Sequence, residues 1–343
     1  MSGHPARPAD EAASPAPTSA SAPAPTSAPA PASTSAPAAA SERATREYAE
    51  HRELLFALVY NLLGSVADTE DVLQDTWLAW AARTASPTAG AVEHPKAYLV
   101  RIAVNRALAQ QAAVSRRRET YVGPWLPEPL FGPAAAADGG TDGAAQDVAL
   151  AAERAESVSM ALLVVLETLS PLERSAFVLH EVFGYSGAEI AVILGRNPAA
   201  VRQLVKRARE HVRARRPRYE AAPDVRRRVT ERFLAAALGG DLAALLELLA
   251  PDVTLVGDGG GKAPGGRRPL TGRAKVARLL TALSARPTPA LHLTWRDVNG
   301  APAAVLSAFG RPFAVLVLDL APDGDLVSGI HAVSNPDKLR GLA

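Results

Sequence analysis

The sequence predicts a multidomain protein with two all-α modules, a C-terminal α+β domain and a disordered N-terminal tail. Three observations lead to this prediction. Residues 43–118 and 151–218 contain helical patterns only. Residues 219–343 begin with helices and continue as strand-like runs. Residues 1–42 are almost wholly Ala, Pro, Ser and Thr, a composition that cannot bury enough apolar area to offset chain entropy.

Composition sets the broad class of the protein. The chain has 343 residues, enough for two or three domains, and its hydrophobic content of 48% supports real cores. It contains no cysteine, which excludes disulfides, thiolate zinc sites and cysteine nucleophiles and fits a reducing cytoplasm. No apolar run approaches about 18 residues, and the N-terminus lacks a hydrophobic signal core, so no membrane span is expected.

Three helices are expected in residues 43–118. An apolar face that includes Leu54, Leu58 and Leu62 ends at Gly64. The second helix is expected from about residue 68 to residue 83, and a loop rich in Pro, Gly, Ser and Thr follows at 84–95. The third helix starts near Pro95, where a missing N–H costs nothing, and runs to 118.

Residues 119–150 read as a linker that contains an unusual island, YVGPWLPEPLF, at 121–131. Flexible linkers rarely carry Tyr, Trp, Leu and Phe among prolines. We interpret the island as a docking segment, because exposed aromatic side chains need a partner surface. Incidental composition is the alternative interpretation.

Residues 185–210 predict a helix-turn-helix. Ser186 caps the first helix, Gly195 ends it in the left-handed region, and Asn197 with Pro198 starts the second. Upstream, SPLER at 170–174 predicts another helix start with a capping box. The second helix carries cations on its outer faces, which suits a DNA major groove.

The net charge of +2 conceals a strongly basic segment. Residues 196–228 contain twelve lysines and arginines against three acids. Such a segment neutralises phosphates and gives salt-dependent affinity for nucleic acid. A merely solvated helix face is the alternative.

The C-terminal domain is predicted to place a curved antiparallel sheet over helices. Helices are expected at 224–238, 241–249 and 272–285, and a PDGD hairpin turn at 322–325. The strand-like runs are VTLVG, ALHLTWRDV, APAAVLSAF, RPFAVLVLDL and LVSGIHAV.

Three local patterns together resemble the extracytoplasmic-function sigma factors of bacterial RNA polymerase. They are DTEDVLQDTWLAW at 68–80, HPKAYLVRIAVNRAL at 94–108 followed by SRRR at 115–118, and the helix-turn-helix. By spacing, Asp68, Asp71 and Asp75 share one helical face. The resemblance implies that core polymerase binds through the clamp of its largest subunit to the acidic helix, namely to Asp68, Glu70, Asp71, Gln74 and Asp75.

The same resemblance implies two promoter-reading surfaces and a contact with the flap of the second-largest polymerase subunit. The −10 element is assigned to Arg101, Asn105, Arg106, Arg116, Arg117 and Arg118, with Asn105 holding an extruded base through its amide. The −35 element is assigned to Arg202, Gln203, Lys206, Arg207 and Arg209. Many members carry an arginine where this chain has Leu204, so the −35 sequence that is read stays open.

The linker island, DGGGK at 258–262 and NPDKL at 335–339 resemble one subgroup of that family, whose members carry a SnoaL-like domain of the nuclear-transport-factor-2-like fold. The resemblance implies control of the sigma modules in cis by this domain. Three glycines in a row suggest a backbone packed against another surface, with Asp258 and Lys262 paired at its ends. A flexible hairpin loop is the alternative. The residues implied are Tyr121, Trp125, Pro127, Asp258, Gly259, Gly260, Gly261, Lys262, Asn335, Pro336 and Asp337.

Three functions follow for testing. The first is an alternative sigma factor tuned by its own C-terminal domain, with core RNA polymerase and promoter DNA as partners, no membrane association, no cofactor and no metal. The second is a DNA-binding repressor or activator with a small-molecule sensing domain. The third is an enzyme of the SnoaL-like class. Polar candidates for a ligand cavity or catalysis are Asp258, His292, Trp295, Asp297 and His331.

Overall fold

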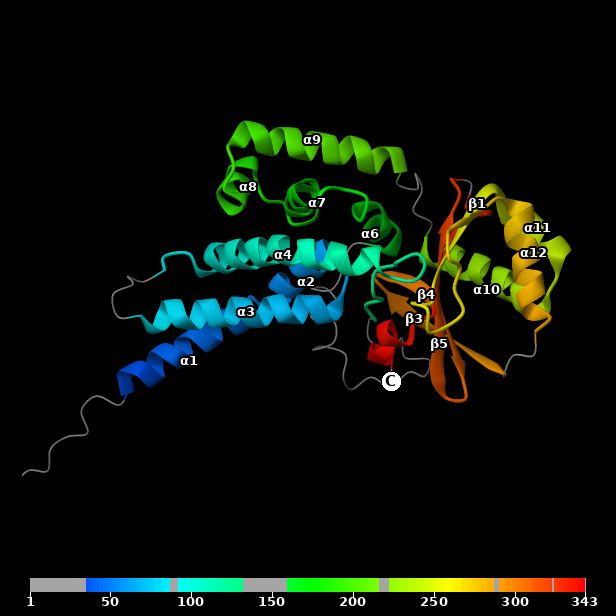
Figure 1. Cartoon of the computed structure of the whole chain (residues 1–343), viewed down its shortest axis with the longest axis horizontal. Coiled ribbons are helices and arrows are strands. Elements are labelled where there is room, and N and C mark those ends of the chain that lie inside the picture. Colours follow the sequence, from blue (N-terminus) through cyan, green and yellow to red (C-terminus); the bar gives the residue numbers. More distant parts are fainter. Residues whose placement is uncertain are drawn as a thin grey trace, which may run out of the picture.

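The computed structural model describes residues 35–86, 92–131, 159–215, 222–286, 290–322 and 324–342. Two helical modules lie side by side at one end of the molecule and the sheet-containing domain lies at the other (Figure 1). The segment 120–131, called the linker segment below, runs between them (Figure 1). Across the described residues, no helix combines the length and apolar character that a membrane span requires.

The N-terminal module contains α1 (Ser35–Ala49), α2 (Arg52–Leu63), α3 (Val66–Ala85) and α4 (Pro95–Glu119). Gly64 ends α2 with φ 68°, as predicted from its position. Ser65 then caps α3 through its side chain. The aromatic ring of Trp80 is fully buried and its indole N–H donates to the Ala44 carbonyl at 3.0 Å, which fixes α1 against α3.

Helix α1 begins at Ser35, inside the range predicted to be disordered. Residues 35–42 are alanine-rich, and alanine has the highest helix propensity, so packing downstream is enough to extend the helix into them. Ala44 and Tyr48 provide that packing against α3. Residues 1–34 of the predicted tail lie outside the described residues.

The second helical module contains α6 (Met160–Leu166), α7 (Pro171–Phe177), the π-helical turn η1 (Val178–Val182), α8 (Gly187–Leu194) and α9 (Pro198–Arg215). The predicted helix starts and stops are confirmed. Ser170 and Ser186 each form a complete capping box, Gly195 ends α8 with φ 60°, and the Asn197 side chain accepts the Ala200 N–H at 2.7 Å. Helices α8 and α9 form the predicted helix-turn-helix.

The C-terminal domain contains α10 (Pro223–Gly239), α11 (Leu242–Leu248), β1 (Leu249–Asp258), β2 (Leu270–Thr271), α12 (Arg273–Ser284), β3 (Leu291–Val298), β4 (Ala301–Ala308), β5 (Arg311–Leu320) and β6 (Val327–Val333), then the 3-10 turns η2 (Pro336–Lys338) and η3 (Arg340–Leu342). The strand order is β2-β1-β6-β5-β4-β3. Strands β3 to β6 form the expected antiparallel meander. Strand β1, however, pairs in parallel with β6, so the sheet is mixed rather than wholly antiparallel.

The sheet is covered on both faces. On one face, Phe233, Leu245 and Ile330 belong to a core formed with helices α10 to α12. On the other face, Val317 and Val333 pack against Leu126 of the linker segment. A sheet buried on both sides needs two covers. The linker segment therefore completes the C-terminal domain at the same time as it joins the helical modules.

Candidate functional site

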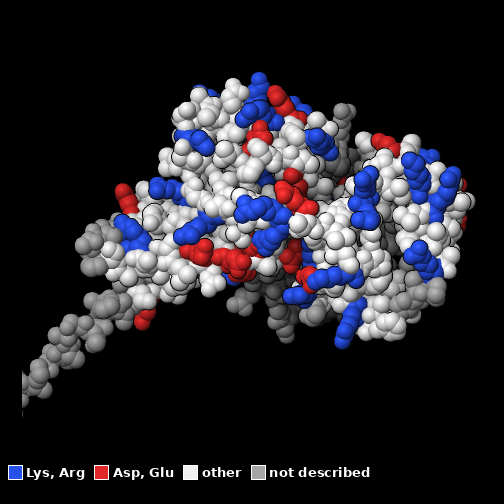
Figure 2. Space-filling model, viewed as in Figure 1, with Lys and Arg blue, Asp and Glu red and all other residues white. Residues whose placement is uncertain are grey.

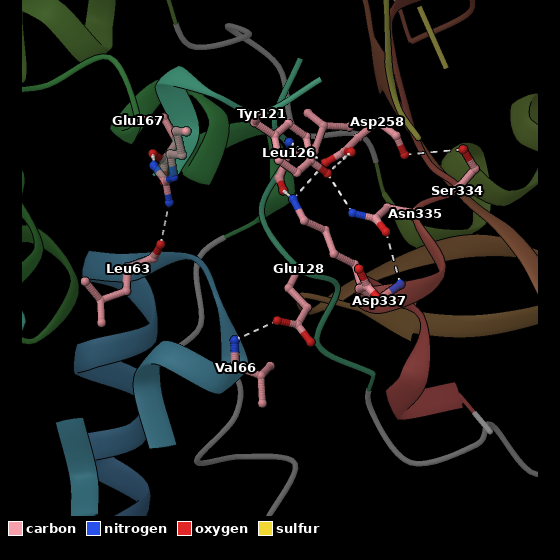
Figure 3. A network of polar contacts seen from close by, with 12 residues as sticks. Leu63, Val66, Tyr121, Leu126, Glu128, Glu167, Asp258, Ser334, Asn335 and Asp337 are labelled. Carbon is pink, nitrogen blue, oxygen red and sulfur yellow. Dashed lines mark hydrogen bonds and ion pairs between the residues drawn. The ribbon is translucent and has the colours of Figure 1, made fainter. Parts of the chain in front are cut away.

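Asp258, the last residue of β1, is the centre of the contacts between the C-terminal domain and the linker segment. Its side chain is completely buried. One carboxylate oxygen accepts the Tyr121 hydroxyl, and the other accepts the Leu126 backbone N–H at 2.9 Å and the Lys338 ammonium at 2.7 Å (Figure 3). The Asp258 carbonyl accepts the N–H groups of Ser334 and Asn335, at 2.8 and 2.9 Å.

Lys338 supplies the positive charge of this site. Its ammonium also donates to the Leu126 carbonyl and lies 3.9 Å from the centre of the Trp125 ring. Burial lowers the pKa of Lys338 to about 8, while the Asp258 carboxylate acts in the opposite direction. Since a buried charge is tolerated only when it is paired, Asp258 and Lys338 need each other.

The glycines after Asp258 pack against the linker segment without room for a side chain. Gly260 has φ 59°, and a Cβ there would lie 2.4 Å from the Asn335 amide nitrogen and 2.9 Å from the Tyr121 hydroxyl. Gly261 has φ 71°, and a Cβ there would lie 3.1 Å from Val122. Asn335 in turn donates to the Tyr121 hydroxyl at 2.7 Å. The loop geometry therefore fits a bare backbone packed on another surface.

The expected pair between Asp258 and Lys262 does not form. Lys262 is exposed and pairs with Asp337, which also accepts Arg340 at 2.8 Å. Asp258 points inward and takes Lys338 instead. Burial explains the difference. The Asp258 carboxylate lies in the interior, where the buried Lys338 side chain contacts it, whereas Lys262 follows the glycine loop and its side chain lies in solvent.

Trp125 links the linker segment to both helical modules. The guanidinium of Arg118 lies 3.5 Å from the centre of its ring. Arg118 also donates to the Leu63 carbonyl at 2.7 Å and pairs with Glu167, which pairs with Arg174 at 2.6 Å (Figure 3). Burial and the neighbouring Arg174 lower the pKa of Arg118. Arg118, assigned to −10 DNA by the resemblance, is thus held within the protein here.

A second set of contacts was missed by sequence reasoning. Glu128 of the linker segment accepts the Val66 N–H at 2.8 Å, at the start of α3 (Figure 3). The Tyr60 hydroxyl donates to the Glu128 carbonyl at 2.5 Å and accepts the Asn299 amide at 2.9 Å. Asn299 lies in the β3–β4 turn with φ 51° and only 2% exposure. An asparagine followed by a glycine is typical of a hairpin turn, so this dipeptide by itself gives no sign of a contact with another module.

Among the acidic residues of α3, Asp68 differs from the others. It is buried and pairs with Arg117 of α4, so it does not share an exposed face with Asp71 and Asp75. Glu70, Asp71, Gln74 and Asp75 are exposed. Figure 2 shows acidic side chains gathered over α3 beside basic ones along α4. Glu70 pairs with Arg52 at 2.8 Å, and Asp75 with Arg106 at 3.3 Å.

The asparagine assigned to −10 DNA contacts the helix-turn-helix. Asn105 donates from its amide nitrogen to the Ile193 carbonyl near the end of α8, at 3.1 Å, and to the Arg101 carbonyl at 2.7 Å. Arg101, Arg106 and Arg116 remain exposed. In this arrangement the Asn105 amide is directed to the protein rather than to a nucleic-acid base.

The residues assigned to −35 DNA are exposed along α9. Arg202, Lys206 and Arg209 line an open cleft of about 690 Å³ with His180 and Gly187. Arg209 pairs with Glu181 at 2.6 Å, and Arg207 with Glu173 at 3.2 Å. Gln203 is exposed, whereas Leu204 is 7% exposed and belongs to the module core. An arginine at position 204 would therefore be buried in this structure.

The cavity candidates are not brought together. His331 pairs with Asp319 at 2.8 Å and lies opposite Val317, on the sheet face that meets the linker segment. Trp295 packs in the core on the helix-covered face. His292 and Asp297 are exposed on the edge strand β3. Asp319, which sequence reasoning missed, had no recognisable motif around it.

Family models match both helical modules. Residues 48–117 match sigma-70 region 2, and residues 159–212 match sigma-70, region 4. The chain is 36% identical over 303 residues to the ECF RNA polymerase sigma factor SigJ of Mycobacterium tuberculosis, covering 86% of this chain and 93% of SigJ. It is 31% identical over 293 residues to the probable ECF RNA polymerase sigma factor SigI of the same organism, covering 85% and 93%.

The similarity extends to three dimensions. The crystal structure of SigJ superposes with a TM-score of 0.66 at 35% sequence identity, covering 87% of this chain and 98% of that one. That coverage includes the C-terminal domain, so the relative shares the arrangement of two helical modules followed by a sheet-containing domain.

Proposed function

The chain belongs to the extracytoplasmic-function (ECF) sigma factors of RNA polymerase, and we propose that its SnoaL-like C-terminal domain controls this sigma factor in cis. As a sigma factor it acts with core RNA polymerase and promoter DNA in promoter-directed transcription. The proposal includes two contacts with core polymerase. The exposed acids of α3 bind the clamp of the largest subunit, and residues 159–215 bind the flap of the second-largest subunit.

The observation that supports control in cis is the capture of the linker segment by Asp258. The segment leaves the −10 module at the end of α4, and its Leu126 shares a buried cluster with Met160 at the start of the −35 module. Asp258, Lys338 and the glycine loop hold the path of the segment through buried polar contacts. Buried polar networks are geometrically strict, because each unpaired group costs free energy. A domain that fixes the path in this way fixes the relation of the two promoter-reading modules.

The Asn105 contact supports the same proposal from the other side. Its amide nitrogen donates to the Ile193 carbonyl of α8. The N–H group used in this contact cannot at the same time donate to an extruded base. Helices α7 and α8 pack directly on α4. Promoter opening then requires the two sigma modules to separate, and separation breaks the contact of Leu126 in the linker segment with Met160 of α6. The C-terminal domain biases this equilibrium through contacts that differ between the closed and open arrangements.

Reconstituted transcription tests the proposal. Core RNA polymerase is combined with full-length protein, with residues 1–218, or with a chain that ends before Asn335, on promoters selected by genomic binding. Control in cis predicts that initiation differs between full-length protein and residues 1–218, and that loss of the terminal segment alone gives a third level. The chain that ends before Asn335 keeps every strand of the sheet but lacks Lys338, the cation that pairs with Asp258. Equal initiation by all three proteins would contradict control in cis.

A further inference from the structure

A cleft of about 630 Å³ lies between the linker segment and the loop that follows β1. Its walls are Thr120, Tyr121, Val122 and Gly123 on one side and Arg267 and Arg268 on the other. In Figure 1 the yellow segment after β1 turns toward the end of α4. The two arginines belong to the C-terminal domain, and no part of the regulatory network described above uses them.

Arg267 and Arg268 are exposed cations of the C-terminal domain. Neither side chain forms a hydrogen bond or an ion pair with any residue that the structure describes. This distinguishes them from Lys262 and Arg340 nearby, which both pair with Asp337. Two adjacent free guanidinium groups are suited to phosphate oxygens, which they bind bidentately.

The loop that carries these arginines is fixed in place by its backbone. Gly123 approaches it so closely that a Cβ there would lie 2.8 Å from the Gly266 carbonyl oxygen. The Ser334 hydroxyl donates to the Pro264 carbonyl. The arginines therefore project from a fixed position at the edge of the cleft rather than from a free loop.

The cleft opens beside the basic end of α4. Thr120 follows the last residue of α4, whose last turn carries Arg116 and Arg117. Glu119 removes one charge, and Arg117 is partly neutralised by Asp68. Figure 2 shows lysine and arginine side chains along α4 and again on the C-terminal domain beyond it. A polyanion that lies along α4 would meet Arg267 and Arg268 next.

We propose that Arg267 and Arg268 contact the phosphate backbone of promoter DNA, so that the C-terminal domain is itself part of the DNA-binding surface. Asn299 ties this domain to α2, and Glu128 ties the linker segment that packs on the domain to α3. Neither contact involves α8 or α9. The arginines thus keep their place beside α4 when the −35 module moves. The proposal rests on the promoter-directed function of the chain and is independent of control in cis.

The test uses holoenzyme made from core polymerase and full-length protein, bound to duplex fragments that wild-type holoenzyme selects from a random pool. Affinity is measured over a series of salt concentrations. The slope of log K against log salt is negative, and each lost phosphate contact reduces its magnitude by about 0.9. R267A/R268A is therefore expected to reduce that magnitude by about 1 to 2. The control K275A/R278A removes two exposed charges from α12 of the same domain and should leave the slope unchanged. R267K/R268K should restore most of it.

Two results would overturn the proposal. One is the same salt slope for R267A/R268A and wild type. The other is weaker assembly of R267A/R268A with core polymerase at an unchanged DNA slope, which would assign the arginines to an acidic protein surface. Position is tested separately, since the chain has no cysteine: a DNA-cleaving reagent on Arg268→Cys should cut promoter DNA beside the −10 element. Failure of control in cis would instead appear as equal initiation by full-length protein and by the chain that ends before Asn335, both of which keep Arg267 and Arg268, with the salt effect intact.

Discussion

Lys338 and Asp258 form an ion pair of 2.7 Å in which the two side chains are 9% and 0% exposed. Two residues 80 positions apart in the sequence thus meet in the interior of the C-terminal domain, with the linker segment closing the site through Leu126 and Tyr121. Removing either partner of a buried pair leaves an uncompensated charge, and that is far more costly than losing an exposed pair.

Lys338→Met is therefore expected to release the linker segment. The buried Asp258 carboxylate would lose its cation at a cost of about 3–5 kcal/mol, and the segment would undock to hydrate it. Hydrogen exchange of the Leu126 amide, which Asp258 accepts, should accelerate by about 100-fold or more. Lys275→Met, at an exposed position on α12, is the matched control. Unchanged exchange at Leu126 in the Lys338 variant would count against this role.

The same lysine predicts a pH dependence of stability. Its pKa is about 8 in the folded protein, below its ordinary value of 10.5, so the unfolded chain binds more protons between these values. Its contribution to stability accordingly rises with pH through this window, and the cost of burying the ammonium is fully present below about pH 8. Thermal midpoints of wild type and Lys338→Met are compared at pH 7.5 and 9.5. Wild type should gain relative to the variant, and a constant difference would refute the assignment.

Asn299→Gly is expected to loosen the C-terminal domain from the N-terminal module. Glycine keeps the left-handed backbone, but the amide that donates to Tyr60 at 2.9 Å and accepts the Leu130 N–H at 3.3 Å is lost. Groups left unpaired in a buried site cost about 1–3 kcal/mol, so exchange of the Leu130 amide should accelerate roughly 10- to 100-fold.

The β4–β5 turn offers a matched control for this change. Phe309 also has φ 51° and precedes a glycine, but it is 87% exposed. Phe309→Gly makes the same backbone change with no lost contact to the helical modules, so exchange at Leu130 should stay as in wild type. Equal acceleration in both variants would show that turn flexibility, and not the Asn299 amide, is responsible.

Reversing charge on α3 should separate polymerase binding from DNA binding. Asp71→Lys with Asp75→Lys is expected to abolish binding to core polymerase, because the exposed acids of this helix are the proposed docking surface. Glu247→Lys with Asp252→Lys adds the same charge at exposed positions of the C-terminal domain and serves as the control. Core binding is measured by fluorescence anisotropy of labelled protein. Retained binding by the α3 variant would exclude this surface.

Local chemistry explains which parts of the fold were predictable. The starts of α7 and α8 follow from Ser170 and Ser186, since a capping box involves residues only three apart. The meander follows from alternating strands joined by short turns. Helix α1 was missed in its first turns because composition favoured disorder, whereas packing against α3 decides the matter.

The site was less predictable, because its contacts join distant positions. Asp258 and Lys262 are four residues apart, and that proximity suggested a pair, but the true partner of Asp258 is 80 residues further along the chain. The parallel pairing of β1 with β6 makes this contact possible by placing residues after β6 beside the end of β1. Asn299 reaches Tyr60 across 239 residues. No local pattern encodes such a separation.

The order of these contacts along the chain has a consequence for synthesis. Both sigma modules are complete at Arg215, but the residues that close over the linker segment end with Lys338. At translation rates of about 5–20 residues per second, the nascent sigma modules exist without their cover for roughly 6 to 25 s. During this interval each nascent chain carries both sigma modules without the contacts of the C-terminal domain. How long these modules stay available to free polymerase in that form depends on how fast the rest of the chain is made.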